Sequence, residues 1–414
     1  MSFKAIFIAL SISTALVVAA FMLHQQRPEE ELHQPTMQLV RASGKCAQCH
    51  RKETAAVVRE YEMSRHAAEE VNCLDCHSPA EEQESYTHRG FVITKNPTAK
   101  NCYQCHQTEY DQYLRSRHAA PAWAAVRGAQ DFNQEQIAHA EKFHPGAVER
   151  TPNELALLEG PAAAEVGCLG CHSVGKPNRD GSIGTCSACH TRHNASVEQA
   201  RTPRTCGQCH MGPDHSQIEI YESSKHGVIF EVQSDMMNME VPPKELGTED
   251  MWVPTCSTCH MSGLEGMGVT HDTTERLSYW LFAAVSDRRP HYEHAQVQMK
   301  SVCQKCHSSE SVDQFYEDAE SVVRATNRKV REARDLMDQL HQEGLLSPQS
   351  FDEPLEYEYF DLWHYYGRTA KHGAFMGGAD FVQWHGNYEL LRKIIEMKHK
   401  AKELRRKKRN PNEE

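Results

Sequence analysis

The stretch from residue 184 to residue 193 reads Gly-Thr-Cys186-Ser-Ala-Cys189-His190-Thr-Arg-His193 and contains the Cys-x-x-Cys-His unit that dominates this chain. Eight such units account for all sixteen cysteines: Cys46/Cys49/His50, Cys73/Cys76/His77, Cys102/Cys105/His106, Cys168/Cys171/His172, Cys186/Cys189/His190, Cys206/Cys209/His210, Cys256/Cys259/His260 and Cys303/Cys306/His307. Two thiols at this spacing can form thioethers with one haem, while the adjoining histidine reaches the haem iron as its proximal ligand. The units therefore predict eight covalently attached c-type haems.

Zinc ribbons and disulfide frameworks are the alternative interpretations of so many closely spaced cysteines. Neither of them requires a histidine directly after every second cysteine, and no cysteine is left over here. We therefore favour the haem interpretation.

The composition agrees with a core that is made largely of haems. The chain has 414 residues, of which 39% are hydrophobic, so about fifty residues are present for each expected haem. We expect a mainly α fold in which helices and loops wrap a haem-packed core, with long helices towards the carboxy terminus. The formal net charge of -12 argues against nucleic-acid binding and favours redox partners or small ions that are steered by local charge.

Residues 5–23 form an uncharged apolar run directly after Lys4. The run is close to the roughly 20 residues that span a bilayer and is longer than the apolar part of a cleaved signal peptide. We expect residues 1–31 to act as a signal or membrane anchor and linker, and we favour an uncleaved anchor over a cleaved signal. Haem attachment takes place on the exported side, so we expect the protein on the periplasmic side of the cytoplasmic membrane.

A second repeat follows three haem motifs, at Tyr61-Glu-Met-Ser-Arg-His66, Tyr113-Leu-Arg-Ser-Arg-His118 and Tyr221-Glu-Ser-Ser-Lys-His226. A histidine at a repeated position after a haem loop can bind the iron of a neighbouring haem. We therefore predict distal ligands at His66, His118 and His226, and further ones at His88, His193, His271 and His294, with His291 as the alternative to His294. Other histidines, including His144 and His341, are predicted to face solvent.

Three regions follow the expected anchor. Residues 32–310 form the predicted octahaem-binding domain, residues 311–404 a helical domain without cysteine, and residues 405–414 a charged tail that we expect to be disordered. Apolar residues recur at three- and four-residue steps from Val322 to Leu340, which is typical of a long amphipathic helix. We expect these haem-free helices to pack subunits together, and a cap over the chain's own haem core is the alternative.

Several runs of sequence resemble the hydroxylamine oxidoreductase family of octahaem cytochromes. They are Cys186-Ser-Ala-Cys189-His190-Thr-Arg-His193, Cys206-Gly-Gln-Cys209-His210-Met-Gly-Pro-Asp214-His215 and the segment from Gly373-Ala-Phe375 to Trp384-His385-Gly386. The resemblance covers most of the chain after Cys46. It implies a homotrimer and a catalytic fourth haem, which here is attached to Cys168 and Cys171 and ligated by His172. It also implies that Asp214 and His215 form the catalytic pair above that haem.

The pair also has a physical rationale of its own. An imidazole that titrates near neutral pH, beside a carboxylate, is a suitable proton relay over an open iron. Seven predicted distal histidines for eight haems leave one iron open to a substrate. Without the resemblance, a helix cap at Asp214 and a surface position for His215 would be the plainer interpretation.

The sequence departs from the family at the cross-linking residue. In the oxidising members, a tyrosine from a neighbouring subunit is bonded to the catalytic haem. The matching segment 380–386 holds Phe381 and His385 and no tyrosine, although Tyr388 lies just beyond it. The resemblance therefore implies the uncross-linked, reductive branch of the family.

Reduction of nitrite or hydroxylamine to ammonium at the fourth haem is the leading hypothesis for the function. The alternatives are oxidation of hydroxylamine or hydrazine at the same haem, or an electron conduit in which every haem has two histidine ligands. A tetrathionate-type octahaem reductase is a minor alternative, since no lysine ligand is evident at the fourth haem. We expect a membrane quinol dehydrogenase or a small cytochrome as the redox partner.

The eight motifs lead to a direct prediction about haem content. Mass spectrometry of the purified, fully matured protein should show eight haem additions, because each motif supplies both thiols and a ligand. Six or fewer additions would refute the assignment.

Overall fold

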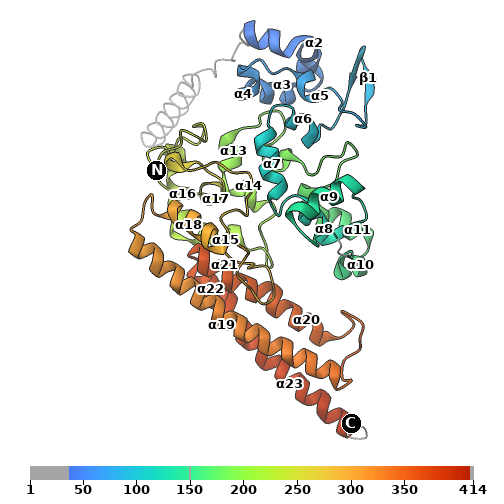
Figure 1. The fold of residues 1–414 in the computed structure, drawn as a ribbon, viewed down its shortest axis with the longest axis vertical. Coiled ribbons are helices and arrows are strands. Elements are labelled where there is room, and N and C mark those ends of the chain that lie inside the picture. The colour runs from blue at the N-terminus through green and yellow to red at the C-terminus, as the bar shows by residue number, and fades with distance from the viewer. Residues whose placement is uncertain (1–36, 149–150, 411–414) are drawn as a thin grey trace, which may run out of the picture. The chain divides into compact units, whose positions relative to one another are not determined.

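The computed structural model describes residues 37–148 and 151–410, with side chains from residue 44 onward. Helices dominate the described residues, and the only named sheet among them is an antiparallel hairpin of two short strands. The predicted mainly α fold is therefore confirmed. Figure 1 shows how short helices and loops make up most of the chain before long helices take over near the carboxy terminus.

The chain divides into two compact units, residues 1–73 and 74–414. The first unit contains α2 (Met37–Glu53), α3 (Ala55–Glu62) and α4 (Arg65–Ala68), and α5 (Cys73–His77) begins at its end. The second unit contains the hairpin β1 (Tyr86–His88) and β2 (Phe91–Ile93), in which Thr87 faces Val92.

The remaining elements of the second unit are short until α18. The α-helices are α6 (Ala99–Tyr103), α7 (Gln107–Arg115), α8 (Ala120–Arg127), α9 (Gln134–Phe143), α10 (Glu154–Glu159), α11 (Pro161–Ala163), α12 (Leu169–His172), α13 (Val197–Arg201), α14 (Pro203–Gly207), α15 (Gln217–Ser223), α16 (Lys225–Gln233), α17 (Cys256–His260), α18 (Tyr292–Cys303), α19 (Ser309–Gln342), α20 (Pro354–Phe360), α21 (Arg368–Met376), α22 (Ala379–Val382) and α23 (Glu389–Arg409). Short π-helices, which are wider than α-helices, occur at η1 (Ala164–Cys168), η6 (Asp361–Gly367) and η7 (Gln383–Tyr388). Tighter 3₁₀ turns occur at η2 (Ser173–Gly175), η3 (Cys186–Ala188), η4 (Ser234–Met236) and η5 (Leu264–Gly266).

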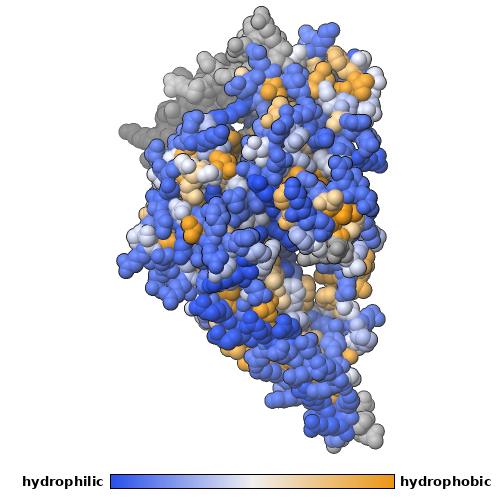
Figure 2. All heavy atoms as spheres, in the orientation of Figure 1, coloured by the Kyte–Doolittle hydropathy of each residue, from blue (hydrophilic) through white to orange (hydrophobic). Residues whose placement is uncertain are grey.

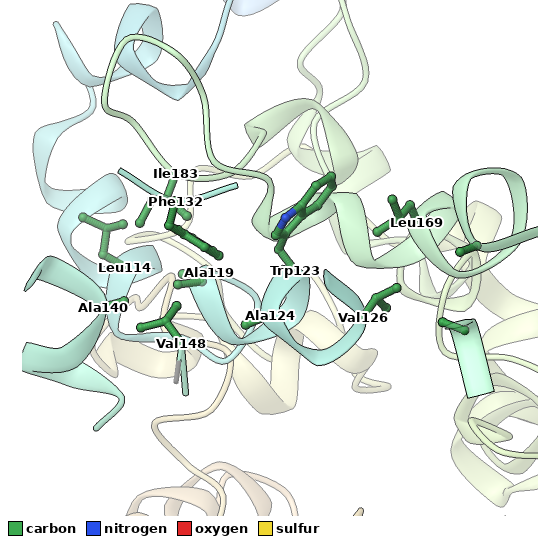
Figure 3. Packing of buried hydrophobic residues seen from close by; sticks show 13 residues of the cluster. Leu114, Ala119, Trp123, Ala124, Val126, Phe132, Ala140, Val148, Leu169 and Ile183 are labelled. Atoms are coloured by element: carbon green, nitrogen blue, oxygen red, sulfur yellow. The ribbon is translucent and has the colours of Figure 1, made fainter. Parts of the chain in front are cut away.

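One apolar cluster gathers around α8 and the fourth haem motif. Figure 3 shows Trp123, Ala124 and Val126 of α8 within this cluster, together with Leu169 of the motif itself. Gly175 lets the chain after the motif approach the start of α8, because a Cβ there would collide with the Ala119 carbonyl oxygen. The fourth motif is thus fixed against α8 by packing on both of its sides.

A second apolar cluster joins the carboxy-terminal helices. Val330 and Leu340 of α19 pack in it with Leu390, Ile394 and Met397 of α23, and all five are almost fully buried. The two helices run side by side in Figure 1, while Figure 2 shows mainly hydrophilic side chains on their visible face. The apolar periodicity expected from Val322 to Leu340 is confirmed, because Val323, Val330 and Leu340 are buried.

The structure corrects two details of the sequence analysis. Helix α23 continues to Arg409, where we expected disorder from residue 405, because Arg405 pairs with Glu343 at 2.7 Å and Lys408 contacts the Glu343 carbonyl oxygen. His144 is 7% exposed, not solvated, since its Nε2 lies 3.2 Å from the Leu114 carbonyl oxygen.

The expected anchor, residues 5–23, lies outside the described residues. Within residues 37–148 and 151–410, no helix is both long enough and apolar enough to cross a bilayer.

Candidate active site

The haem motifs fold into tight turns that bring the first cysteine close to the histidine. In four motifs, the histidine amide donates a hydrogen bond of 2.9–3.0 Å to the carbonyl of the first cysteine, namely from His106, His190, His210 and His307. No disulfide joins any of the sixteen cysteines, all of which lie within the described residues. The thiol sulfurs, which would become thioether sulfurs, are therefore available for haem attachment.

The two cysteines of a motif differ in exposure. In five motifs the first cysteine is half-buried, but the second is exposed, namely Cys49, Cys76, Cys105, Cys189 and Cys306.

The predicted proximal ligand of the first haem, His50, is half-buried near the end of α2. Its Nδ1 lies 2.8 Å from Oγ1 of Thr54, one helical turn further along. Its role as a ligand stays a prediction. His106 and His307 are exposed.

Cysteines of different motifs also meet. Side-chain hydrogen bonds join Cys102 to Cys186 and Cys206 to Cys256, and they link the third motif with the fifth and the sixth with the seventh. A further hydrogen bond joins Cys171 to Cys209 and so links the fourth motif with the sixth. Thioether bonds lie at the edge of a haem, so these contacts indicate that haem edges approach one another closely. Such an arrangement suits electron transfer between haems.

Four pairs of histidine rings within the described part of the second unit test whether haems fit. Each pair joins a motif histidine to a predicted distal histidine, and the ring centres are 6.4 Å apart in His77–His193, 5.8 Å in His118–His210, 6.4 Å in His190–His271 and 6.0 Å in His226–His307. An imidazole–metal bond is about 2.0–2.1 Å long, so two rings that share one metal ion have centres roughly 6 Å apart. The spacing therefore fits an iron between each pair.

Burial keeps two imidazoles of these pairs, and His260 of the seventh motif, in the form that binds a metal. It lowers the pKa of His118 to about 3 and the pKa of His210 and His260 to about 4, with nearby histidines as a second cause. A neutral imidazole has a free nitrogen lone pair for iron. In His210, Nδ1 faces the Gln217 side-chain oxygen at 3.3 Å, which leaves Nε2 for the metal.

For the other predicted distal ligands, the structure gives the position of each side chain, and the role as a ligand stays a prediction. His66 lies on α4 and His88 is exposed at the end of β1, and their roles stay predictions. His294 is exposed on α18, where its Nε2 lies 2.9 Å from the Gln298 amide, and His291 caps the same helix. Among the described residues, neither makes a ring contact with His260, the half-buried histidine of the seventh motif.

Like His260, His172 has no histidine ring facing it among the described residues, but His172 of the fourth motif has Asp214 and His215 in its electrostatic surroundings. Its Nδ1 lies 2.6 Å from the Ala122 carbonyl oxygen of α8, which fixes the ring and directs Nε2 away from that helix. Burial lowers the pKa of His172, and the charges of His215 and Asp214 act on it as well. The structure thus brings the predicted catalytic pair into the electrostatic neighbourhood of the fourth motif.

Asp214 and His215 form a hydrogen-bonded pair. Oδ2 of Asp214 lies 2.5 Å from Nδ1 of His215, and both side chains are about 30% exposed. Burial alone would raise the pKa of Asp214, but the hydrogen bond and the charge of His215 lower it below its usual value. The carboxylate therefore stays ionised and orients the imidazole, whose Nε2 is left to exchange protons.

The sequence analysis missed the residues that surround this pair. The Phe282 ring lies 4.9 Å from the His215 ring, and its loop is held by buried Lys371, whose Nζ donates to the Ala283 carbonyl at 2.8 Å. His364 of η6 acts to lower the pKa of Asp214, and Asp214 acts to raise the pKa of Arg368 at the start of α21. These residues lie in the haem-free helices, where we expected only subunit packing. The aromatic and basic run Trp363-His-Tyr-Tyr-Gly-Arg368 was the signal that could have indicated a site.

Facing histidine pairs, Cys-x-x-Cys-His turns and a helical fold without a large sheet define a multihaem c-type cytochrome. A family model described as seven times multi-haem cytochrome CxxCH matches residues 69–354. The chain therefore belongs to this family of multihaem cytochromes.

Comparison with known proteins gives a more specific relationship. A protein of Kuenenia stuttgartiensis named as a probable nitrite reductase-hydroxylamine oxidoreductase fusion is 26% identical over an alignment of 344 residues, and the match covers 75% of this chain. This chain spans only 39% of that relative. The resemblance to the hydroxylamine oxidoreductase family is thus confirmed.

Two solved structures share the fold. A hypothetical multiheme protein has a TM-score of 0.74 and 22% identity, and the match covers 89% of this chain and 98% of the other. The Kuenenia stuttgartiensis reducing HAO-like protein complex has a TM-score of 0.66 and 21% identity, and the match covers 87% of this chain and 85% of the other. These similarities establish the multihaem fold.

Replacing one distal histidine tests the pairing. We predict that His271→Ala keeps the full haem content, because the fifth haem is still bonded to Cys186 and Cys189, but produces one new high-spin ferric signal in electron paramagnetic resonance. His341→Ala, at an exposed position, is the control and should leave the spectrum unchanged. A spectrum of His271→Ala without a new high-spin signal would show that His271 does not ligate His190's haem.

Proposed function

We propose that this protein is an exported octahaem cytochrome that reduces nitrite, hydroxylamine or both to ammonium at the haem of the fourth motif. One observation carries the proposal: His172 faces no second histidine among the described residues, and the Asp214–His215 pair lies near it instead. The name of the Kuenenia stuttgartiensis relative, a nitrite reductase-hydroxylamine oxidoreductase fusion, supports chemistry on nitrogen compounds.

The fourth haem, when bound through Cys168, Cys171 and His172, would supply electrons and an open iron position for a nitrogen compound. His215 would hold a proton at Nε2 and release it to the substrate oxygen. Asp214 would stabilise the protonated imidazole and fix its orientation, since its carboxylate accepts from Nδ1. Phe282 packs against the imidazole and limits the access of water to it.

The residues near the predicted cross-linking position favour reduction over oxidation. Phe381 and His385 stack at 4.9 Å, and Nε2 of His385 lies 3.0 Å from Asp380. Neither side chain has a phenol that could bond to a haem. Tyr388, at the end of η7, is 48% exposed and is the residue through which the oxidative alternative would act.

Reduced-viologen oxidation with nitrite, and then with hydroxylamine, tests the reaction itself. We expect the fully haem-loaded protein to consume the viologen with at least one of the two substrates and to release ammonium. If it consumes no viologen with either substrate and binds no nitrite, the conduit alternative is correct.

The catalytic pair has its own prediction. His215→Ala and Asp214→Asn should each lower turnover at least about tenfold at unchanged haem content, because general acid catalysis contributes about 10²–10⁴. Unchanged turnover in both variants would remove the pair from the site.

We also propose that the protein works as a homotrimer, held by its N-terminal segment at the periplasmic face of the cytoplasmic membrane. A membrane quinol dehydrogenase or a small cytochrome would then be its electron donor. Trp384, Tyr388, Leu391 and Ile395 support the assembly, because they recur at three- and four-residue steps along η7 and α23 and are each 48–60% exposed. An apolar stripe of this kind favours burial against another subunit.

Two adjacent isoleucines separate assembly from folding. Ile395→Glu should convert the trimer to monomers in sedimentation velocity without changing haem content, because Ile395 is 60% exposed on α23. Ile394→Ala, at a position 3% exposed, should instead lower the free energy of unfolding by about 2–5 kcal/mol. A monomeric wild-type protein would contradict the trimer. Subunits that stay covalently joined in denaturing gels would favour the cross-linked, oxidative alternative.

A further inference from the structure

Arg368 is held in a fixed position beside the Asp214–His215 pair. Its Nε donates to the Phe282 carbonyl oxygen at 2.9 Å, and its Nη1 donates to Nε2 of His364 at 2.8 Å. The guanidinium also stacks on two aromatic rings, 5.2 Å from the centre of Phe282 and 5.1 Å from the centre of Trp363. Two hydrogen bonds and two stacking contacts therefore determine where the charge lies.

The same segment contacts the loop that carries the catalytic pair. Thr369, the next residue, has its Oγ1 3.1 Å from Ser216 Oγ and 3.5 Å from the Pro213 carbonyl oxygen. Phe282 bridges the two groups directly, because its ring contacts both the His215 imidazole and the Arg368 guanidinium. Arg368 is thus part of the surroundings of His215 and is not a distant surface charge.

The cluster has donors that lack acceptors. Within the described residues, Nη2 of Arg368 donates no hydrogen bond and Arg368 forms no salt bridge. Nε2 of His364 accepts from Arg368, so its Nδ1 carries the proton. That Nδ1 is buried and has no hydrogen-bond partner in the described part of the chain. Buried donors are nearly always paired, so this Nδ1 can donate to an acceptor from outside the protein chain, either a water molecule or a bound anion.

Arg368 stays positively charged in this setting. Burial lowers its pKa to about 10, and Asp214 acts in the opposite direction. The guanidinium is half-buried and forms no salt bridge among the described residues, so an anion that pairs with it would stabilise its charge. Its planar fork matches anions that present two oxygens, such as nitrite or a carboxylate.

We infer that Arg368, positioned by His364 and Phe282, binds a small two-oxygen anion at the Asp214–His215 site and so makes the site selective for nitrite over neutral hydroxylamine. The inference rests on the proposed reduction of nitrogen compounds at this site. Nitrite carries a charge that the guanidinium can pair with, whereas hydroxylamine at neutral pH does not. The competing source of a two-oxygen anion is a haem propionate.

Steady-state and binding measurements on the full-length, haem-loaded protein test the inference. In Arg368→Gln, we expect the KM for nitrite and the nitrite dissociation constant of the ferric protein, measured by optical titration, to rise about tenfold to a hundredfold. The KM for hydroxylamine should change less than about threefold. Arg368→Lys should lie between the wild type and Arg368→Gln, because it keeps the charge and loses the fork.

Arg289→Gln is the matched control, since Arg289 is also partly buried and stacks 4.4 Å from the centre of Trp280, with Nη1 on the Thr274 carbonyl oxygen. It should leave nitrite binding unchanged. An Arg368→Gln protein that binds nitrite as the wild type does would overturn the inference. So would a shift of haem reduction potential at unchanged nitrite affinity, because it would assign Arg368 to a propionate.

Failure of the inference can be told apart from failure of the proposed function. A wild-type protein that binds nitrite but reduces neither substrate contradicts the function, while the nitrite titration of Arg368→Gln still decides the role of Arg368. If both substrates lose affinity equally in that variant, the site has lost its shape and not an anion contact, which also overturns the inference.

Discussion

Two imidazoles that face each other across about 6 Å form the contact on which most of this structure depends. His77 meets His193, and His226 meets His307, although many residues separate the members of each pair. An iron between the rings would bond both histidines, while the cysteines of the same motif bond the porphyrin. Each haem therefore joins two distant segments, and the short helices between them need few apolar contacts of their own.

The same constraint underlies the proposed reactivity of the fourth motif. Where two histidines hold an iron, its coordination is complete and it can only pass electrons. His172 has its ring fixed by the Ala122 carbonyl oxygen, and the hydrogen-bonded pair of Asp214 and His215 acts on it. The thiol contact of Cys171 with Cys209 links this motif to the sixth, so electrons could reach it through neighbouring haem edges. In the proposed function, the open iron, the proton source and the electron supply would meet at this motif.

The sequence predicts these features to very different extents. The motifs and the repeated Tyr-x-x-Ser-basic-His segments are local patterns, so haem attachment and distal histidines such as His118 and His226 could be recognised directly. Helix α19 could be predicted equally well, because Val323, Val330 and Leu340 follow a helical period. Asp214 and His215 are adjacent in sequence, so a family resemblance was enough to predict that they form the catalytic pair.

Contacts between distant segments could not be predicted in this way. Arg368 and His364 approach Asp214 only because η6 introduces a wide π turn and Thr369 meets the loop at Ser216, and no periodicity encodes that approach. Helix α23 continues through the charged residues at its end because Arg405 pairs with Glu343, whereas the local run of charges favours disorder.

The central claim is that one haem in each chain has an open iron and that the others have two histidine ligands. Titration of the fully haem-loaded ferric protein with cyanide, followed by optical and electron paramagnetic resonance spectroscopy, tests this claim most directly. The account predicts that one cyanide binds per chain, that one high-spin signal converts to low spin, and that His172's haem is the one affected. A protein that binds no cyanide, or that binds it at several haems, would contradict the account.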